Sequence, residues 1–478
     1  MFVLHKCLGY FYGLKIATMK IVKRLPFLAL IVVIYYSCES NTASSTLDTE
    51  INADTAKTDG HPSWIMQGNI YEVNVRQYTP EGTFKAFEPN LQRLKDMGVQ
   101  TLWFMPINPI SKIDRKGELG SYYAVSNYDA INPEFGNMDD WKSLVKKCHE
   151  MGFKVIIDWI PNHTGGDHYW LQQHPDFYVR DSVTGKVISP FDWTDTRKLN
   201  YANPVFVDTM INAMKFWLKE SDIDGFRCDV AGDVPDAFWK KCIPELKTGR
   251  NIFMLAEGNK ASLQDDGFDA TYTWDEFSMM KQIAKGERPA FALDSVLNRV
   301  DSTFPKTRLL MYFTSNHDEN SWNKADYATM PGESHAPFAI LTQTIGKSIP
   351  LIYSGQEEPF LDSISFFYKD TITFGKYARA DLYKKLLALR KENPALAANA
   401  AFKKLKTTND NAVYAFARES GKRKLLVLLN LSNKAQSFNI EHGDFAGKPL
   451  NIFSGVNEAL MNNRKFDLKP WGYIVYSY

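Results

Sequence analysis

Short apolar runs alternate with amphipathic stretches through most of this chain, starting near residue 64. The runs IYEVNVRQY (70–78), TLWFMPI (101–107) and KVIIDWI (154–160) are typical of buried strands, and segments with helical periodicity separate them. Repeated strand–helix units with apolar strands indicate a buried parallel sheet with helices outside it. About eight such units over roughly 330 residues predict an α/β fold of the (β/α)8 type, a TIM barrel.

The other expected elements continue this alternation. We expect strands at 223–230, 252–258, 309–315 and 349–355, and helices at 87–99, 138–153, 204–221, 238–247, 335–346 and 382–396. The first of these helices is predicted to end at Gly98, because glycine readily adopts the left-handed conformation that terminates a helix.

Two regions depart from the strand–helix rhythm. Residues 161–203 are a long aromatic and polar stretch after the third strand, and a loop of this length is usually functional or a small subdomain. From residue 397 the apolar residues alternate with polar ones, and polar turns separate the runs. We therefore expect a barrel domain at 61–396 with a short loop subdomain inserted at 161–203. Residues 397–478 are expected to form a C-terminal antiparallel β-sandwich that packs against the barrel.

The N-terminal residues have the features of a targeting segment. From Met19 the chain reads MKIVKRLPFLALIVVIYYSCES, with a basic start, an apolar run too short to span a bilayer, and Cys38. This is similar to a bacterial lipoprotein signal, which implies a leader at 1–37, a lipid on Cys38 and a flexible tether at 38–60. The protein would then be exported and held to a membrane of the cell envelope, in the periplasm or at the outer membrane. A plain secretory signal that leaves Cys38 unmodified is the alternative.

Charge and cysteine content exclude several other classes of protein. The formal net charge is +1, so no overall field favours nucleic acid or an acidic partner. Beyond the N-terminal segment, Cys148, Cys228 and Cys242 are scattered, without a CxxC pair or a histidine cluster. This spacing argues against a disulfide framework and a zinc site, and we interpret Cys228 as a small buried residue.

Four segments, in a fixed order, each place acidic or amide side chains at the end of a strand-like run. They read VIIDWIPNH (155–163), DGFRCD (224–229), IFMLAEG (252–258) and MYFTSNHD (311–318). In a (β/α)8 barrel the C-terminal strand ends carry the functional residues, so we expect these side chains to meet. Asp229, Glu257 and Asp318 bring carboxylates from separate strands, and cleavage of a glycosidic bond needs a carboxylate pair.

In order and spacing, these segments resemble the four signature regions of the α-amylase family, glycoside hydrolase family 13. The flanking text NYDAINPEFG (127–136) and LIYSGQEE (351–358) is also similar to the family, and the resemblance extends from about residue 64 to the C-terminus. It implies a retaining mechanism with Asp229 as the nucleophile and Glu257 as the general acid and then the base. Asp318 would bind the ring hydroxyls and stabilise the distorted transition state.

The resemblance also implies the protonation states of the two reacting carboxyl groups. Arg227 would hold Asp229 ionised, since a neighbouring cation lowers the pKa of a carboxyl group. Glu257 would be protonated at the start of the reaction, which a less polar setting favours.

Four further residues are implied to contact or support the sugar: Tyr123 as a stacking ring, His163 and His317 as hydrogen-bond partners of hydroxyls, and Asp158 from the third strand. The resemblance implies no organic or redox cofactor. It leaves a calcium ion open, with Asn162 as the one ligand it suggests, because the sequence has no evident Asp-rich calcium loop. After Asp229 the chain reads VAGDVP where many relatives have a Lys-His pair, which leaves the preference for the leaving group open.

The tryptophans of these regions divide into two groups. Trp103, Trp159 and Trp217 lie in apolar runs and are expected in the core. Trp170 and Trp193 lie in the 161–203 stretch, where they could stack on more distant sugars.

Taken together, these features predict a secreted, monomeric, lipid-anchored hydrolase of α-1,4-linked glucose chains in starch and maltodextrins. Two alternatives stay open. A transglycosylase, an isomerase or a cyclomaltodextrinase-like enzyme would use the same covalent intermediate, and a glucan-binding surface protein would use the same surface without catalysis. Endo or exo attack, chain-length preference and tolerance of α-1,6 linkages depend on loop shapes that these motifs do not determine.

Overall fold

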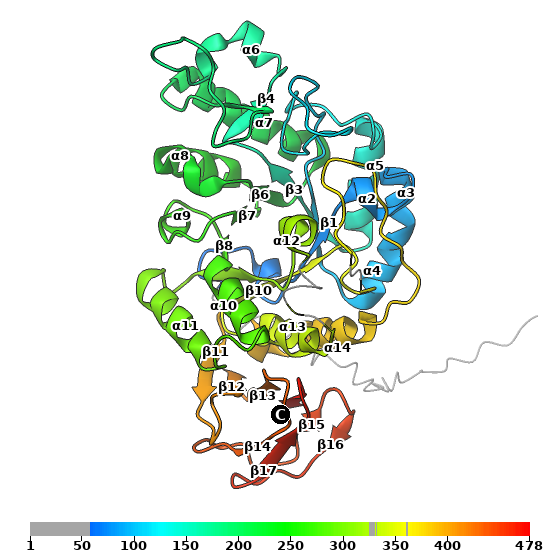
Figure 1. Cartoon of the computed structure of the whole chain (residues 1–478), viewed down its shortest axis with the longest axis vertical. Helices are drawn as coiled ribbons and strands as arrows, with labels where there is room; N and C mark the ends of the chain where they lie inside the picture. The colour runs from blue at the N-terminus through cyan, green and yellow to red at the C-terminus, as the bar shows by residue number, and fades with distance from the viewer. Residues whose placement is uncertain (1–57, 325–329, 331, 360–361) are drawn as a thin grey trace, which may run out of the picture. The chain divides into compact units, whose positions relative to one another are not determined.

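The computed structural model describes residues 58–324, 330, 332–359 and 362–478 (Figure 1). The expected leader at 1–37, the residue Cys38 and most of the tether at 38–60 lie outside the described residues. Within the described part of the chain, no helix has both the length and the apolar character needed to cross a bilayer.

Parallel strands close into a barrel, in the order β1-β10-β9-β8-β7-β6-β3-β2, as the strand–helix pattern predicts. The strands are β1 (Ile70–Val73), β2 (Thr101–Phe104), β3 (Lys154–Trp159), β6 (Gly225–Cys228), β7 (Phe253–Ala256), β8 (Ala270–Tyr272), β9 (Leu309–Tyr312) and β10 (Ser348–Tyr353). All of these residues except Lys154 are buried, because the barrel wall faces packed side chains inside and helices outside.

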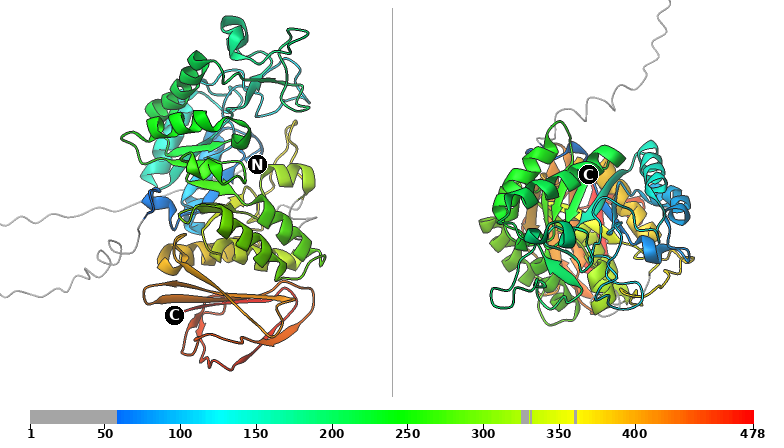
Figure 2. Two further views of the ribbon diagram at one scale, coloured as in Figure 1. Left: turned by 90° about the vertical axis from the view of Figure 1, so that its left-hand side faces the viewer. Right: turned by 90° about the horizontal axis from the view of Figure 1, so that it is seen from above.

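Helices connect the strands and cover the outside of the barrel, as Figure 2 shows from two further sides. The longer helices are α4 (Leu91–Met97), α5 (Met138–Glu150), α7 (Pro204–Ser221), α8 (Asp236–Lys247), α10 (Trp274–Ala284), α11 (Ala292–Thr303), α12 (His317–Asn323), α13 (His335–Thr344) and α14 (Ala380–Glu392). The single-turn helices are α2 (Val75–Tyr78), α3 (Phe84–Phe87), α6 (Trp170–Gln173) and α9 (Ser262–Asp265). The prediction for Gly98 is confirmed, since it follows α4 with a φ of 100°.

Some element boundaries differ from the sequence-based expectation. The first strand ends at Val73 instead of continuing to residue 78, because the chain turns into the short helix α2. Strand β8 was not predicted, since a strand of 3 residues is too short to show a period. The helices α10 and α11, which follow β8, were not predicted either.

The long stretch after β3 forms a small subdomain, as predicted. It begins with β4 (His163–Gly165), which pairs antiparallel with β5 (Thr196–Lys198) near the end of the stretch. Trp170, on α6 between these strands, is only 2% exposed and packs against Phe177 and Phe206. Trp170 is therefore a core residue of this subdomain, which corrects the expectation that it could stack on sugars.

The C-terminal residues form two antiparallel sheets, and the predicted sandwich is confirmed (Figures 1 and 2). One sheet has the order β11-β12-β13-β18-β15-β16 and the other pairs β14 with β17. Their bounds are β11 (Ala401–Leu405), β12 (Val413–Ser420), β13 (Arg423–Asn430), β14 (Gln436–Asn439), β15 (Leu450–Asn451), β16 (Val456–Asn457), β17 (Lys465–Leu468) and β18 (Tyr473–Ser477). Alternate residues of β12 face opposite sides, so Tyr414 packs in the barrel's apolar cluster and Val413 packs with Phe438 of the second sheet.

The predicted core residues are buried as expected. The side chains of Trp103, Trp159 and Trp217 are fully buried. Three cysteines within the described residues are buried free thiols, namely Cys148, Cys228 and Cys242. Burial raises the pKa of the Cys228 thiol well above its usual range, which supports its interpretation as an unreactive core residue.

Candidate active site

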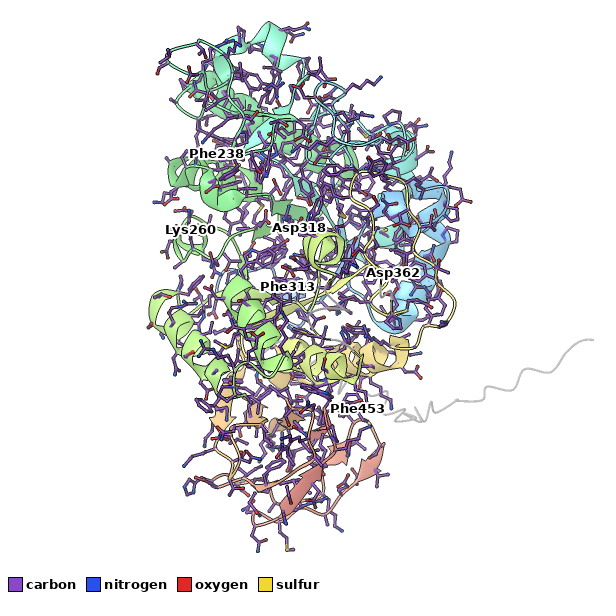
Figure 3. The ribbon with its side chains drawn as sticks, in the orientation of Figure 1. Phe238, Lys260, Phe313, Asp318, Asp362 and Phe453 are labelled. Carbon is purple, nitrogen blue, oxygen red and sulfur yellow. The ribbon has the colours of Figure 1, made fainter. Side chains whose placement is uncertain are left out.

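The acidic residues singled out in the sequence meet at the C-terminal ends of the barrel strands. Asp158 lies near the end of β3, Asp229 directly follows β6, and Glu257 directly follows β7. Asp318 lies in the first turn of α12, close to the centre of the barrel in Figure 3. Asp229, Glu257 and Asp318 all line one cavity of about 430 Å³. The structure thus brings together the three carboxylates that the sequence places on separate strands.

The buried Arg227 connects the carboxylates beside this cavity. Its Nη1 donates hydrogen bonds to Oδ1 of Asp158 at 2.8 Å and to Oδ1 of Asp229 at 2.9 Å. Its Nη2 forms an ion pair with Oε2 of Glu257 at 3.0 Å, and its Nε donates to the hydroxyl of Tyr272 at 3.0 Å. One fully buried guanidinium therefore contacts carboxylates from three neighbouring strands and holds them close together.

The strand β6 can approach its neighbour closely enough to build this arrangement because it begins with a glycine. A Cβ atom added to Gly225 would lie 1.9 Å from the carbonyl oxygen of Phe253 on β7. Glycine at this position lets the two strands pair while Arg227 and Asp229 project from the end of β6.

The protonation of the reacting pair differs from the expectation. Burial raises the pKa of Asp229 well above its usual range, and the charge of Glu257 raises it further. Burial also raises the pKa of Glu257, but Arg227 and the N–H of Val230, which donates to Oε2 at 2.8 Å, lower it by more. In the free protein the proton therefore favours Asp229 rather than Glu257. We expected the reverse, because the sequence does not show that the same arginine contacts both carboxylates.

His317 and Tyr123 form a second part of the cavity wall. Nε2 of His317 lies 2.8 Å from the Tyr123 hydroxyl and 3.4 Å from Oδ2 of Asp318. The Tyr123 hydroxyl donates to Oδ2 of Asp158 at 3.1 Å, and the ring stacks on His317 at 5.5 Å between centroids. Burial lowers the pKa of His317, but Asp318 and Glu72 raise it by more, to about 9. These carboxylates therefore favour the protonated form of His317 at neutral pH.

His163 lies on β4, also lines the cavity, and has different electrostatics. Its burial lowers its pKa to about 4, so the ring is neutral at physiological pH. Nδ1 of His163 lies 3.2 Å from Nδ2 of Asn162, whereas Nε2 has no hydrogen-bond partner among the described residues. A buried ring nitrogen without a partner beside a cavity is suited to bind a ligand hydroxyl.

Aromatic side chains that the sequence analysis did not single out complete the cavity. Trp322 and Phe366 line it together with Trp193, which does belong to the 161–203 stretch. Trp322 is 55% exposed and its ring lies 5.2 Å from that of Phe366, which in turn stacks on Tyr123. Flat apolar faces of this kind suit the apolar faces of sugar rings. Trp322 lies on α12, four residues after Asp318, and this closeness in the sequence was the only signal for it.

No metal site accompanies these residues in the part of the chain that the structure describes. No group of three or more histidine, cysteine, aspartate or glutamate side chains within it could hold a metal ion. Asn162, the one suggested calcium ligand, is buried against His163 instead of lying among carboxylates. Calcium prefers a shell of six to eight oxygen ligands. Calcium at Asn162 stays a prediction, and no chemical step is assigned to a metal.

A closed parallel barrel with paired carboxylates at its C-terminal strand ends defines a glycoside hydrolase site. The family model "Alpha amylase, catalytic domain" matches residues 48–198 and 181–259, and "Maltogenic Amylase, C-terminal domain" matches residues 402–475. The chain belongs to the α-amylase family, glycoside hydrolase family 13.

Known relatives of this chain carry more than one activity name. It is 24% identical to "Alpha-amylase MalA" of Haloarcula japonica over 80% of this chain and 58% of that protein. It is 25% identical to the "Cyclomaltodextrinase" of Thermoanaerobacter pseudethanolicus, over 74% of this chain and 64% of that protein. The chain thus spans less than two thirds of the length of these two curated relatives.

Solved structures extend the likeness to the whole described fold. The noncanonic maltogenic α-amylase AmyB from Thermotoga neapolitana superposes with a TM-score of 0.79 at 27% identity, covering 86% of this chain and 99% of that one. An α-amylase from Lactobacillus plantarum superposes with a TM-score of 0.77 at 28% identity, covering 87% and 99%. Both likenesses include the barrel and the C-terminal sheets.

Proposed function

We propose that the protein is a retaining glycoside hydrolase of the α-amylase type that cleaves α-1,4-glucosidic bonds in starch and maltodextrins. The observation that carries this proposal is the buried Arg227 guanidinium, which pairs with both Asp229 and Glu257, two carboxyl groups that line one cavity together with Asp318. Both carboxyl groups contact the same guanidinium and therefore lie near each other. Retaining glycoside hydrolases need two neighbouring carboxyl groups, since one attacks the sugar while the other protonates the leaving group.

In the proposed first step, the Asp229 carboxylate attacks the anomeric carbon of the sugar. The bond from this carbon to the leaving oxygen breaks, and Glu257 gives its proton to that oxygen. In the second step Glu257 takes a proton from water, and the water oxygen attacks the same carbon. The ester bond to Asp229 then breaks, which restores both carboxyl groups and retains the anomeric configuration.

This cycle requires one proton to lie on Glu257 when the substrate is bound. The free pair shares its proton as a coupled unit, so a small change in surroundings can move it from one carboxyl group to the other. The Arg227 hydrogen bond to Asp229 supports the ionised form of that nucleophile once the proton has moved. Asp318, His163, His317 and Tyr123 are proposed to hold the sugar above the pair, as the family resemblance implies.

A cyclomaltodextrinase-like or transglycosylating enzyme is a second candidate. The observation that favours it is the match of residues 402–475 to the C-terminal domain of maltogenic amylases, together with the "Cyclomaltodextrinase" names among the relatives. Such an enzyme would use the same covalent intermediate. It would differ in accepting a cyclic substrate or in letting a sugar hydroxyl replace water.

The first experiment follows the anomeric proton signals when the purified protein is given maltoheptaose. A new α-anomer at early times, absent with Asp229→Asn, supports the retaining mechanism. An early β-anomer would mean inversion and would remove Asp229 from its role. Binding without turnover would favour a glucan-binding surface protein. Products longer than the substrate would support transglycosylation. Faster turnover of β-cyclodextrin than of starch would support a cyclomaltodextrinase-like activity.

Export with a lipid on Cys38 is proposed as the cellular setting of this activity. Its support is the sequence around Cys38 alone, which lies outside the described residues. Metabolic labelling with a radioactive fatty acid tests it. Label in the wild type that is lost in Cys38→Ala supports the anchor, whereas an unlabelled, cleaved protein in the soluble fraction supports a plain secretory signal.

A further inference from the structure

A buried carboxylate that plays no part in the proposed reaction lies behind the cavity. Glu72 is fully buried on β1, and its Oε1 lies 2.5 Å from Nδ1 of His317. Its Oε2 has no hydrogen-bond partner among the described residues. Glu72 does not line the cavity, so it can reach a bound ligand only through His317.

The hydrogen bonds around His317 require a proton on each ring nitrogen. The single hydroxyl proton of Tyr123 is donated to Oδ2 of Asp158; burial raises the pKa of Asp158 to about 6 although Arg227 lowers it, so this group is ionised at pH 7.5. The Tyr123 oxygen must then accept the hydrogen bond that it shares with Nε2 of His317 at 2.8 Å. On the other side of the ring, Nδ1 faces the Glu72 carboxyl group, whose pKa is raised by burial and lowered less by His317; in its ionised form this group can only accept. An imidazole that donates from both nitrogens is a cation.

The charges around the His317 ring favour the same state. The titratable and charged groups that face it are Glu72 of β1, Tyr123 of the loop after β2, Asp158 of β3, Arg227 of β6, Glu257 after β7 and Asp318 of α12. Carboxylates outnumber the single competing cation among them. His163 lines the same cavity without a carboxylate partner, and its pKa falls to about 4 because of burial. The contrast between the two histidines points to the carboxylates next to His317, Asp318 beside the ring and Glu72 behind it, as the cause.

We propose that Glu72 is a positioning residue that keeps His317 doubly protonated, so that Nε2–H is a permanent charged donor beside Asp318. Its consequence for sugar binding rests on the proposed function, because the positive charge of His317 would lie beside Asp318, which binds the sugar, and its Nε2–H would hold the Tyr123 hydroxyl at the cavity wall. A charged donor forms stronger hydrogen bonds to hydroxyl oxygens than a neutral one does. The state of His317 itself does not depend on which substrate the cavity takes.

The test is an NMR titration of protein labelled with carbon-13 at Cε1 of its histidines, with His317→Asn to assign the signal. In the wild type we expect the His317 signal to stay in the protonated position at pH 7.5 and to titrate near pH 9. In Glu72→Gln we expect its midpoint to fall by at least about one pH unit, a tenfold change in proton affinity. Glu276→Gln removes another buried carboxyl group, on α10, and should leave the His317 midpoint unchanged.

Two results would overturn the proposal. One is a wild-type His317 that is neutral at pH 7.5, which is measurable even if Glu72→Gln fails to fold. The other is an unchanged His317 midpoint in a folded Glu72→Gln protein. As a second readout, the alkaline limb of the kcat/KM profile on maltoheptaose should move to lower pH in Glu72→Gln, whereas an equal loss at every pH would indicate a structural role. Absence of any turnover would count against the proposed function but would leave the titration valid.

Discussion

Nη1 of Arg227 lies 2.9 Å from Oδ1 of Asp229, two positions further along the chain at the end of β6. Side chains alternate in direction along a strand, so residues two apart project to the same side and can form this pair without any distortion. The same guanidinium also contacts Asp158 and Glu257. One guanidinium therefore contacts three carboxyl groups, each from a different strand.

Replacing Arg227 should destabilise the protein strongly. In Arg227→Ala, the carboxylates of Asp158 and Glu257 lose their counter-ion, and removal of one partner of a buried ion pair typically costs about 3–5 kcal/mol. Urea unfolding at pH 7 measures this loss. Arg250→Ala is the control, because its pair with Asp222 is well exposed and should contribute less than about 1 kcal/mol. Equal losses in the two variants would contradict the central role of Arg227.

Replacing Glu257 should slow the reaction in a way that depends on the leaving group. We expect Glu257→Gln to lower kcat on maltoheptaose by about 10²–10⁴-fold, the usual contribution of general acid catalysis. A dinitrophenyl glycoside needs no protonation of its leaving group, so its first step should be far less affected. Burst kinetics with the two substrates make the comparison. The same loss with both would remove Glu257 from the acid role.

Acid should destabilise the protein through His168. Burial lowers the pKa of His168 to about 3 from 6.5, and its Nδ1 accepts the N–H of Trp170 at 3.2 Å. Between these pH values the unfolded chain binds one more proton at this residue, so stability falls as the pH falls. The slope is about 1.4 kcal/mol per pH unit for one such group. Unfolding free energies from pH 7 to pH 4 should be less pH-dependent in His168→Asn, and an unchanged slope would contradict this.

Two tryptophans of the 161–203 subdomain should have opposite effects when replaced by alanine. Trp193 lines the cavity, so Trp193→Ala should raise KM for maltoheptaose about threefold to tenfold, if one aromatic contact contributes about 0.5–1.5 kcal/mol. Its melting temperature should change little. Trp170 is buried, so Trp170→Ala should lower the free energy of unfolding by about 3–5 kcal/mol. Thermal melts and initial rates on the two variants separate these outcomes.

The close approach of β6 and β7 should make Gly225 intolerant of a methyl group. In Gly225→Ala the new Cβ would lie 1.9 Å from the carbonyl oxygen of Phe253, so the strands must separate and Arg227 must move. We expect loss of both stability and activity. Gly232→Ala is the matched control, because its Cβ would meet no atom closer than 3.6 Å. A stable, active Gly225→Ala protein would show that the barrel can adjust here.

Sequence patterns predicted the barrel because its strands are apolar runs between amphipathic helices. The same patterns missed β8, whose 3 residues are too few to show a period. They extended the first strand beyond Val73, because α2 is a single turn of 4 residues, too short to show a helical period. Both failures come from elements that are too short to repeat the strand or helix period several times, which is what identifies an element in the sequence.

In the site, sequence reasoning found the residues that end strands but not their electrostatic state. Glu72 was missed because it is one acid within an apolar strand, and its partner His317 is 245 positions away. The coupling between the carboxyl groups of Asp229 and Glu257 was also missed. Their pKa values depend on burial and on a shared arginine, which only the folded arrangement defines.

The apolar cluster that contains Leu255 of the barrel wall continues into the C-terminal sheet, where it includes Val427. Across the same boundary, Arg418 of the sheet donates to the carbonyl oxygen of Thr344 at the end of α13 at 2.8 Å. Removing the sheet would expose this apolar surface and leave buried carbonyl groups without a donor. Barrel and sheet should therefore unfold in one cooperative transition, and a protease should not release a stable barrel on its own.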